Sequence, residues 1–246
     1  MPKVEVNDIE MYYEVPGEGT PLVLLHSFAD AGPIWKPFIP TLKKSFQLII
    51  PDMRGHGQST NPSNKFTHRQ SALDIFNLLD QLGVKQFKAM GFSSGGMTLV
   101  HMATQQPERI KSMVLMAATS YFPAECRELQ AHALDKEDDE GWNASAHLHK
   151  DGEKQMKRLR KQFYEMQLGY DDMNFTPPYL STIKAKTLIV PGDRDGFFPV
   201  GIPVTMYDSI PHSYLWIIPN MGHQILPPSE FLVQTASDFL TGKWEA

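Results

Sequence analysis

Thiols and basic side chains are both scarce in this sequence. Cys126 is the only cysteine among 246 residues, which excludes an internal disulfide and leaves too few thiolates for a zinc or iron–sulfur site. The 23 Lys and Arg residues are outnumbered by 28 Asp and Glu residues, so the formal net charge is −5 and the sequence pI is near 6.0. Such a balance offers no positive field for a phosphate backbone or an anionic membrane. We therefore expect no nucleic-acid partner.

Long apolar runs are missing as well. No stretch of the sequence approaches the length of a membrane span. Residues 1–10 intersperse four charged side chains with single apolar residues, which is unlike the apolar segment of a signal peptide. Together with the single cysteine, these features predict a soluble, cytoplasmic enzyme.

Five short, nearly unbroken apolar runs recur along the chain. Runs of this kind are typical of strands that are buried on both faces. They occupy residues 22–25, 46–50, 113–118, 187–190 and 214–218. Helical patterns separate several of them, and alternating strands and helices predict an α/β fold with a mostly parallel central sheet flanked by helices. A length of 246 residues with 41% hydrophobic side chains suits one such domain.

The clearest helical pattern covers residues 67–82. Thr67, followed three residues later by Gln70, predicts a capping box at its start. The apolar residues expected to share its buried face are Ala72, Ile75, Leu79 and Leu82.

Both ends of the chain have readable patterns. Segments 3–6 and 10–15 alternate apolar and polar residues, which predicts an antiparallel hairpin at the edge of the sheet. A closing helix is expected to start near Ser229, directly after Pro228. The residues it is expected to bury are Phe231, Leu232, Thr235, Phe239 and Leu240, with Trp244 just beyond.

Residues 120–181 interrupt the alternation of strands and helices. The stretch contains an acidic run at 135–140 and a basic helical stretch at 154–161. We interpret it as a mostly helical insertion into a core domain formed by residues 1–119 and 182–246. Its charged side chains are expected to form a solvated outer face rather than a binding patch.

The Gly-Phe-Ser-Ser-Gly sequence at 91–95 lies between an apolar stretch at 87–90 and a helical pattern at 96–105. A serine at the tip of such a strand–turn–helix has a strained backbone, and side chains two residues before and after it would collide. Only Ser93 has glycine at both of these places, which makes it the candidate nucleophile. Ser94 would then begin the helix, where its backbone N–H is expected to face an oxyanion formed at Ser93.

A serine nucleophile needs a base, and the base needs an orienting acid. Asp195 follows the apolar run at 187–190, and His223 follows the run at 214–218. Both side chains are therefore expected at the carboxyl ends of strands, the edge of an open α/β sheet where active sites form. Asp193, two residues earlier in the same loop, is the alternative acid.

His56, His68, His101 and His212 lie in loops or on helices and do not follow a core strand as His223 does. His147 and His149 are spaced so as to point apart on a helix, and no carboxylate or thiolate motif accompanies them, so we expect no metal site. The remaining histidines, interpreted as structural, include His56, His68, His101 and His212.

The order Ser93, Asp195, His223, with a Gly-x-x-Asp loop and Pro199 four residues after the acid, resembles the α/β-hydrolase superfamily. The resemblance covers essentially the whole chain. In that family the acid is the second aspartate of such a loop, which favours Asp195 over Asp193. Asp193 is expected to make local turn hydrogen bonds instead.

Further segments resemble features of the same family. Residues 24–28 resemble its His-Gly loop, and the residue after that pair donates the second oxyanion N–H, which implies Phe28. Ser27 replaces the family glycine, as in some of its enol-lactone hydrolases. Residues 52–59, Asp-Met-Arg-Gly-His-Gly-Gln-Ser, resemble a signature that we interpret as structural. The resemblance also implies that the insertion at 120–181 forms a cap over the active site.

These residues predict a serine hydrolase that cleaves a small carboxylic ester without a cofactor. Ser93, His223 and Asp195 would form the acyl-enzyme machinery, and the Phe28 and Ser94 amides the oxyanion hole. A small-molecule acyl compound is thus the expected partner. The candidate pocket residues are Ser27, Phe197 and Trp142.

Other activities stay open at this stage. Lactone hydrolysis is the nearest alternative because of Ser27, and cleavage of a carbon–carbon bond on the same triad is a third. Epoxide hydrolases and haloalkane dehalogenases are disfavoured, because they have an aspartate where Ser93 stands. From a different class, a slow-turnover small-molecule receptor would use the charged cap as its moving part.

Overall fold

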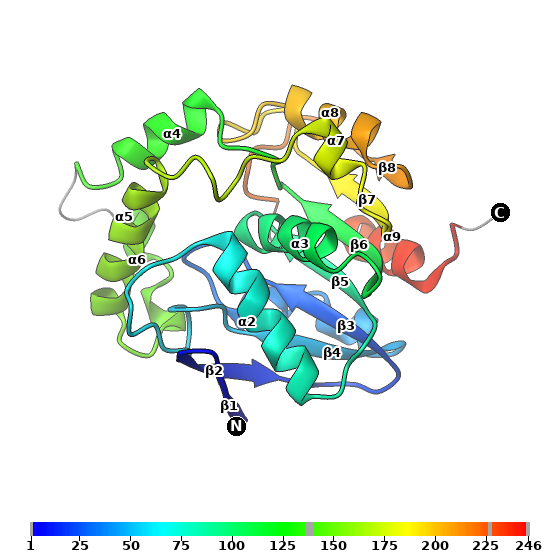
Figure 1. The fold of residues 1–246 in the computed structure, drawn as a ribbon, viewed down its shortest axis with the longest axis horizontal. Helices are drawn as coiled ribbons and strands as arrows, with labels where there is room; N and C mark the ends of the chain where they lie inside the picture. Colours follow the sequence, from blue (N-terminus) through cyan, green and yellow to red (C-terminus); the bar gives the residue numbers. More distant parts are fainter. Residues whose placement is uncertain (1, 136–139, 226–227, 245–246) are drawn as a thin grey trace.

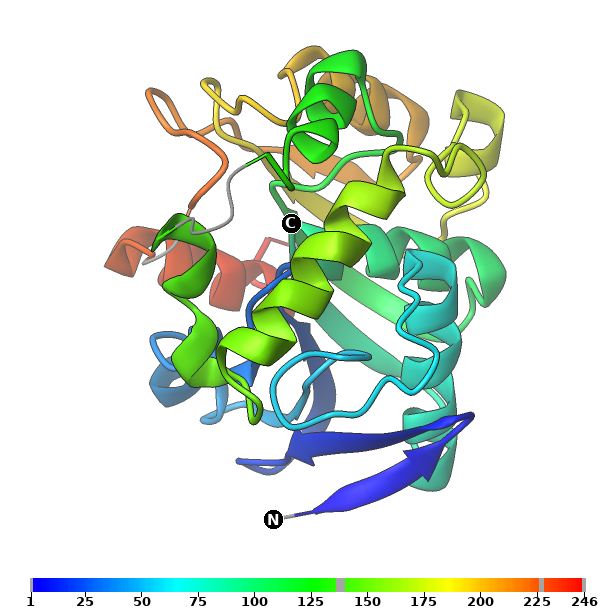
Figure 2. The ribbon, with the colours of Figure 1, turned by 90° about the vertical axis from the view of Figure 1, so that its left-hand side faces the viewer.

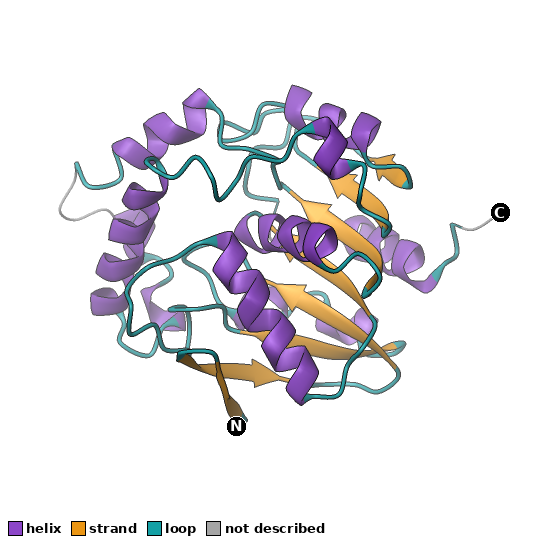
Figure 3. Cartoon of the chain, viewed as in Figure 1, coloured by secondary structure: helices purple, strands orange, loops and turns teal. Residues whose placement is uncertain are grey.

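The computed structural model describes residues 2–135, 140–225 and 228–244. Its central sheet has eight strands in the order β1-β2-β4-β3-β5-β6-β7-β8, in which β3 to β8 pair in parallel and β1 and β2 are antiparallel. Figure 3 shows the strands between two layers of helices. The strands are β1 Lys3–Val6, β2 Ile9–Glu14, β3 Thr20–Leu25, β4 Phe46–Pro51, β5 Phe87–Phe92, β6 Ile110–Met116, β7 Lys186–Val190 and β8 Ser213–Leu215. The predicted α/β fold and the edge hairpin are confirmed.

The parallel strands are buried on both faces, as their apolar runs predicted. In β3, Val23 and Leu25 belong to one hydrophobic core, whereas Leu22 and Leu24 belong to the other. Helices α2 and α3 cover the first face and lie in front of the sheet in Figure 1, and α1 and α9 lie behind it. The helices of the two layers are η1 Gly32–Trp35, α1 Ile39–Leu42, α2 His68–Gln81, α3 Ser94–Gln105, α8 Gly201–Ser209 and α9 Glu230–Thr241.

Helix α2 begins as predicted, but its capping box is only half formed. The Thr67 hydroxyl accepts a hydrogen bond from the Gln70 backbone N–H at 3.1 Å. The Gln70 side chain does not return to Thr67 and donates to Asp74 Oδ1 at 3.1 Å instead, because the carboxylate of Asp74 lies one turn further along. Leu82, at the C-terminal cap, is exposed rather than buried, which corrects one of the four expected core positions.

Helix α9 also begins as predicted, with Ser229 accepting from the Leu232 N–H at 3.1 Å. Phe231, however, is 69% exposed, so its expected burial was wrong. The buried stripe passes through Leu232 and Phe239, and Phe231 lies one residue, or about 100° of helix, away from it. The centroid of its ring lies 5.3 Å from that of the Trp216 ring, just after the edge strand β8.

Between β6 and β7 the chain forms helices beyond the carboxyl ends of the parallel strands. These are α4 Ala124–Ala131, α5 Glu140–Asn143, η2 Ala146–Leu148, α6 Glu153–Met166 and α7 Pro177–Leu180. In Figure 2, α6 runs diagonally across this end of the molecule. The division of the chain into core and cap at 120 and 181 stays a prediction.

The charges of this segment do not all form a solvated face. Residues 136–139 of the acidic run lie outside the described residues. In the basic stretch, Arg160 is buried, and its Nε donates to the Ala133 carbonyl oxygen, which corrects the expectation for this side chain. Over the described ranges, no helix combines the length and apolar character needed to cross a bilayer.

The loop after β4 ties several segments together through buried polar groups. Arg54 Nε donates to Asp74 Oδ2 at 2.8 Å, and Arg54 Nη2 donates to Asp8 Oδ1 at 2.6 Å. Asp52 accepts from the Gly32 and Gln58 backbone N–H groups, each at 2.8 Å. These contacts support the structural interpretation of residues 52–59.

The substitution Asp74→Ala is expected to lower the free energy of unfolding by about 3–5 kcal/mol, because the buried Arg54 guanidinium loses its buried carboxylate partner. Asp8→Ala is the matched comparison. The Asp8 side chain is 52% exposed, so its loss is expected to cost about 1 kcal/mol or less. Urea unfolding of the two variants measures the difference, and equal losses would contradict the central role given to Asp74.

Candidate active site

The turn after β5 holds Ser93 in a strained backbone conformation. Its φ is 50° and its ψ is −115°, a region that non-glycine residues rarely adopt. A Cβ on Gly91 would lie 2.6 Å from the backbone of Gly95, and a Cβ on Gly95 would lie 2.0 Å from the Leu25 carbonyl oxygen. The prediction that only glycine fits at both places is therefore confirmed.

The structure brings Ser93, His223 and Asp195 together in one hydrogen-bonded chain. His223 Nε2 lies 2.9 Å from Ser93 Oγ, and His223 Nδ1 lies 2.8 Å from Asp195 Oδ2. The carboxylate as acceptor fixes the ring with its proton on Nδ1, which leaves Nε2 free to accept the serine proton. Chemically, such an arrangement allows a serine to act as a nucleophile, a histidine as its base and an aspartate as the orienting acid.

Asp195 is held from two sides. Its Oδ1 accepts from the Phe197 and Phe198 backbone N–H groups at 2.8 and 3.0 Å, and Oδ2 is left for His223. The rings of Phe92, Phe197 and Phe198 pack around the imidazole with centroids 4.6–5.8 Å away. The His223 ring is thus fixed by apolar contacts as well as by the Asp195 carboxylate.

Asp193 has a different partner from the one expected. Its Oδ1 accepts from the Met221 backbone N–H at 3.2 Å, two residues before His223. It therefore links the loop of the acid to the loop of the histidine, rather than closing a local turn. Among the described residues, no hydrogen bond joins Asp193 to the His223 ring.

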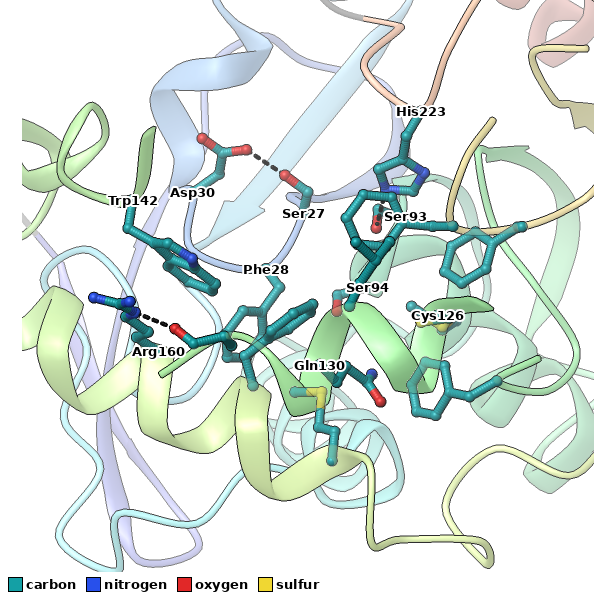
Figure 4. A pocket seen from close by; sticks show the side chains of 18 of the residues that line it. Ser27, Phe28, Asp30, Ser93, Ser94, Cys126, Gln130, Trp142, Arg160 and His223 are labelled. Carbon is teal, nitrogen blue, oxygen red and sulfur yellow. Dashed lines mark hydrogen bonds between the residues drawn. The ribbon is translucent and has the colours of Figure 1, made fainter. Parts of the chain in front are cut away.

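A pocket of about 530 Å³ opens beside Ser93. Figure 4 shows several of its side chains, which come from the core and from the helices between β6 and β7. All of the predicted oxyanion and pocket residues line it: Ser27, Phe28, Ser94, Phe197 and Trp142. The sequence patterns did not identify Met97, Cys126, Gln130, Phe163 and Met166, which also line it.

Ser27 lies in the pocket wall with its hydroxyl already engaged. Its Oγ donates to Asp30 Oδ2, the contact drawn in Figure 4. Both of these residues line the pocket, next to Phe28. The substitution of serine for the family glycine therefore adds a fixed polar pair to the wall.

A second chain of the same residue types ends on Ser94. His68 Nε2 lies 3.0 Å from Ser94 Oγ, and His68 Nδ1 lies 2.7 Å from Asp172 Oδ2. His68 and Ser94 are both fully buried or nearly so. From the sequence, His68 was interpreted only as a structural histidine. Its partner Asp172 is 104 residues away, and no local pattern signals the pairing.

Asp172 is strongly held in its ionised form. It accepts from the His68 and Arg69 backbone N–H groups at 2.8 and 3.0 Å at the start of α2. Burial opposes ionisation, but the His68 imidazole and these hydrogen bonds outweigh it and keep the pKa of the carboxyl well below its usual range. Asp172 therefore both caps α2 and orients His68.

The other histidines have structural surroundings. Burial lowers the pKa of His26 and that of His101 to about 4 in each case, which keeps both rings neutral. His26 Nε2 accepts from the Met53 N–H at 2.8 Å, and His149 Nδ1 accepts from the Gly57 N–H at 2.9 Å. In the part of the chain that the structure describes, no three His, Cys, Asp or Glu residues are placed to hold a metal ion.

Comparisons with known proteins agree on the fold. A sequence profile of the family described as "alpha/beta hydrolase fold" matches residues 20–140. The mouse protein named serine hydrolase BPHL (Mus musculus) is 27% identical over 240 residues, a match that covers 91% of this chain and 80% of the mouse protein. Matches to four other curated proteins, among them a soluble epoxide hydrolase from Corynebacterium sp., span only 39–52% of those proteins' length.

Solved structures of similar fold extend over nearly the whole chain. The enol-lactonase from Burkholderia xenovorans LB400 is similar with a TM-score of 0.79 and 22% identity, over 98% of this chain and 100% of that one. Est816, described as an N-acyl homoserine lactone degrading enzyme, is similar with a TM-score of 0.74 and 26% identity, over 98% and 99%. The first likeness, under 25% identity, bears on the fold alone.

Asp172→Asn is expected to lower the Tm at pH 7 and to lose this effect in acid. Because its pKa is lower in the folded than in the unfolded chain, the ionised carboxylate stabilises the fold above pH about 4, and the contribution disappears as the pH falls through the folded value. Thermal unfolding of the wild type and the variant at pH 7, 4, 3 and 2 measures the gap, which should narrow over the lower three values. Asp171→Asn, at the exposed neighbour, is the control. A gap that stays constant with pH would contradict the prediction.

Proposed function

The chain belongs to the α/β-hydrolase fold family, and we propose that it is a serine hydrolase that cleaves small carboxylic esters through an acyl-enzyme on Ser93. The observation that carries the proposal is the chain from Ser93 through His223 to Asp195, with distances of 2.9 and 2.8 Å, at the wall of a 530 Å³ pocket. A pocket of this size accommodates a small organic molecule.

The first half-reaction forms the acyl-enzyme. Ser93 Oγ attacks the ester carbonyl carbon while its proton passes to His223 Nε2, and Asp195 stabilises the imidazolium through Nδ1–H. The tetrahedral oxyanion collapses, the bond to the alcohol oxygen breaks, and His223 returns the proton to the leaving alcohol. The acyl group then remains on Ser93.

The second half-reaction uses water. His223 takes a proton from a water molecule as that water attacks the acyl carbonyl, and it returns the proton to Ser93 Oγ when the acid departs. We place the oxyanion of both steps at the Phe28 and Ser94 backbone N–H groups, which belong to residues that line the pocket beside Ser93. The loss of one such donor typically raises the barrier by about 3 kcal/mol.

Lactone hydrolysis is the second candidate. A lactone is an internal ester, so the same steps open its ring and leave the alcohol on the released acid. The features that favour it are Ser27 in the pocket wall and the 26% identity to Est816, the enzyme described as degrading N-acyl homoserine lactones.

Hydrolysis of p-nitrophenyl esters from acetate to octanoate tests the proposal. We expect kcat/KM to fall for the longest acyl chains, because a pocket of about 530 Å³ whose wall includes Phe163 and Met166 of α6 limits the chain that fits. Ser93→Ala is expected to lower kcat by about 10⁴-fold or more, because the nucleophile is lost. Ser181→Ala is the control: Ser181 is exposed and does not line the pocket, so this change should leave the rate unchanged.

A lactone panel run beside the esters ranks the two candidates. Wild-type activity that survives Ser93→Ala would sink the acyl-enzyme proposal. A wild-type protein that hydrolyses no ester and no lactone would sink the proposed function as a whole.

A further inference from the structure

Gln130 is a buried polar side chain that the proposed mechanism does not use. It lies in the last turn of α4 and is 0% exposed. Within the part of the chain that the structure describes, neither the nitrogen nor the oxygen of its amide has a hydrogen-bond partner. A buried amide without partners destabilises the folded state, so a side chain of this type needs a reason to be there.

The position of Gln130 supplies that reason, because its side chain faces the pocket of Ser93. Cys126, one turn earlier on α4, is buried and lines the same pocket, so the two residues form the inner face of this helix. In the view of Figure 4, the Gln130 amide lies beyond Ser94 from His223 and projects among the pocket side chains. An amide at this place faces the part of a bound molecule that lies away from its reacting carbonyl.

We propose that the Gln130 amide binds a neutral oxygen group, a keto or hydroxyl oxygen, on the substrate. The inference rests on the proposed ester hydrolysis and narrows its substrate class to esters with an oxygen-bearing chain. A keto oxygen accepts from the Gln130 Nε2–H, and a hydroxyl can in addition donate to Oε1. Either group satisfies the amide only when the substrate is bound.

The surroundings favour a neutral group over a carboxylate. Burial raises the pKa of the Cys126 thiol to about 12, so this neighbour stays uncharged. Met166 adds another apolar side chain to the pocket lining. Two cationic or ionisable side chains also line the pocket, but Arg160 already donates to the Ala133 carbonyl oxygen and His132 pairs with Asp135. A carboxylate placed against the neutral Gln130 amide would therefore lose its hydration and would have to compete for a cation that is already engaged.

Matched pairs of esters test the proposal. On the acyl side, p-nitrophenyl 4-oxopentanoate is compared with the pentanoate, and on the alcohol side, 3-oxobutyl acetate with butyl acetate. In at least one pair, the wild type is expected to prefer the oxo compound by roughly 3- to 10-fold in kcat/KM, the effect of one neutral hydrogen bond. Gln130→Met, which keeps an unbranched chain of similar length, should abolish this preference.

Gln162→Met is the matched control. Gln162 is also buried, lies on α6, and has an amide oxygen without a partner in the described ranges, but it is not among the residues that line the pocket of Ser93. This variant should keep the wild-type preference. The hemisuccinate, in which a carboxylate replaces the acetyl end of 4-oxopentanoate, tests the charge. A preference for the hemisuccinate over the ketone would overturn the neutral assignment.

Thermal unfolding gives a readout that does not depend on turnover. Since Met and Gln have similar helix propensity, Gln130→Met is expected to raise the Tm by about 2–6 °C through removal of the unpaired amide. A lowered Tm would mean that the amide has a partner within the protein and would overturn the proposal.

Binding to Ser93→Ala separates this inference from the proposed function. Calorimetry should show tighter binding of methyl 4-oxopentanoate than of methyl pentanoate, and the double variant with Gln130→Met should lose the difference. If binding shows this pattern but no ester is hydrolysed, the inference about Gln130 stands and the proposed function fails. If esters are hydrolysed without preference in either pair, the inference fails and the proposed function stands.

Discussion

Between β3 and the turn after β5 there is no room for a side chain. A Cβ on Gly95 would lie 2.0 Å from the Leu25 carbonyl oxygen, and Leu25 pairs with Gly91 in the parallel ladder. This contact forces the residues after β3 to lie beside the residues after β5. Ser27 and Phe28 thereby come to line the same pocket as Ser93, and the rest of the site is arranged around that junction.

The parts of the site that could be predicted depend on local rules. The strained turn around Ser93 needs glycine at fixed spacing, and the carboxyl ends of parallel strands meet at one edge, which brings Asp195 and His223 to Ser93. The strands were readable because burial on both faces leaves unbroken apolar runs. The ends of the strands were harder to predict. The apolar run extends to residue 218, but β8 stops at Leu215, although the Ile218 N–H still donates to the Pro191 carbonyl oxygen at 2.9 Å.

The parts that could not be predicted depend on contacts between distant segments. Arginine is usually found at the protein surface, yet the fold buries Arg160 against the Ala133 carbonyl oxygen. Glutamine on a helix is usually exposed to solvent, but Gln130 faces inward because α4 lies over the pocket. Neither residue belongs to a motif, and the periodicity of a short helix does not tell which face will meet a neighbour. The pocket beside Ser93 is therefore the region where sequence patterns carried the least information.

Two chains of serine, histidine and carboxylate end on consecutive residues of one turn. The hydroxyl-to-ring distances are 2.9 and 3.0 Å, and the ring-to-carboxylate distances are 2.8 and 2.7 Å. An automated search for hydrolase sites that used only these side-chain distances as a template would return both chains and rank them almost equally. The backbone separates them, because Ser93 has a φ of 50° whereas Ser94 is the first residue of a regular helix. Templates of this kind should therefore include the backbone dihedral angles of the serine, which distinguish Ser93 from Ser94 where the side-chain distances do not.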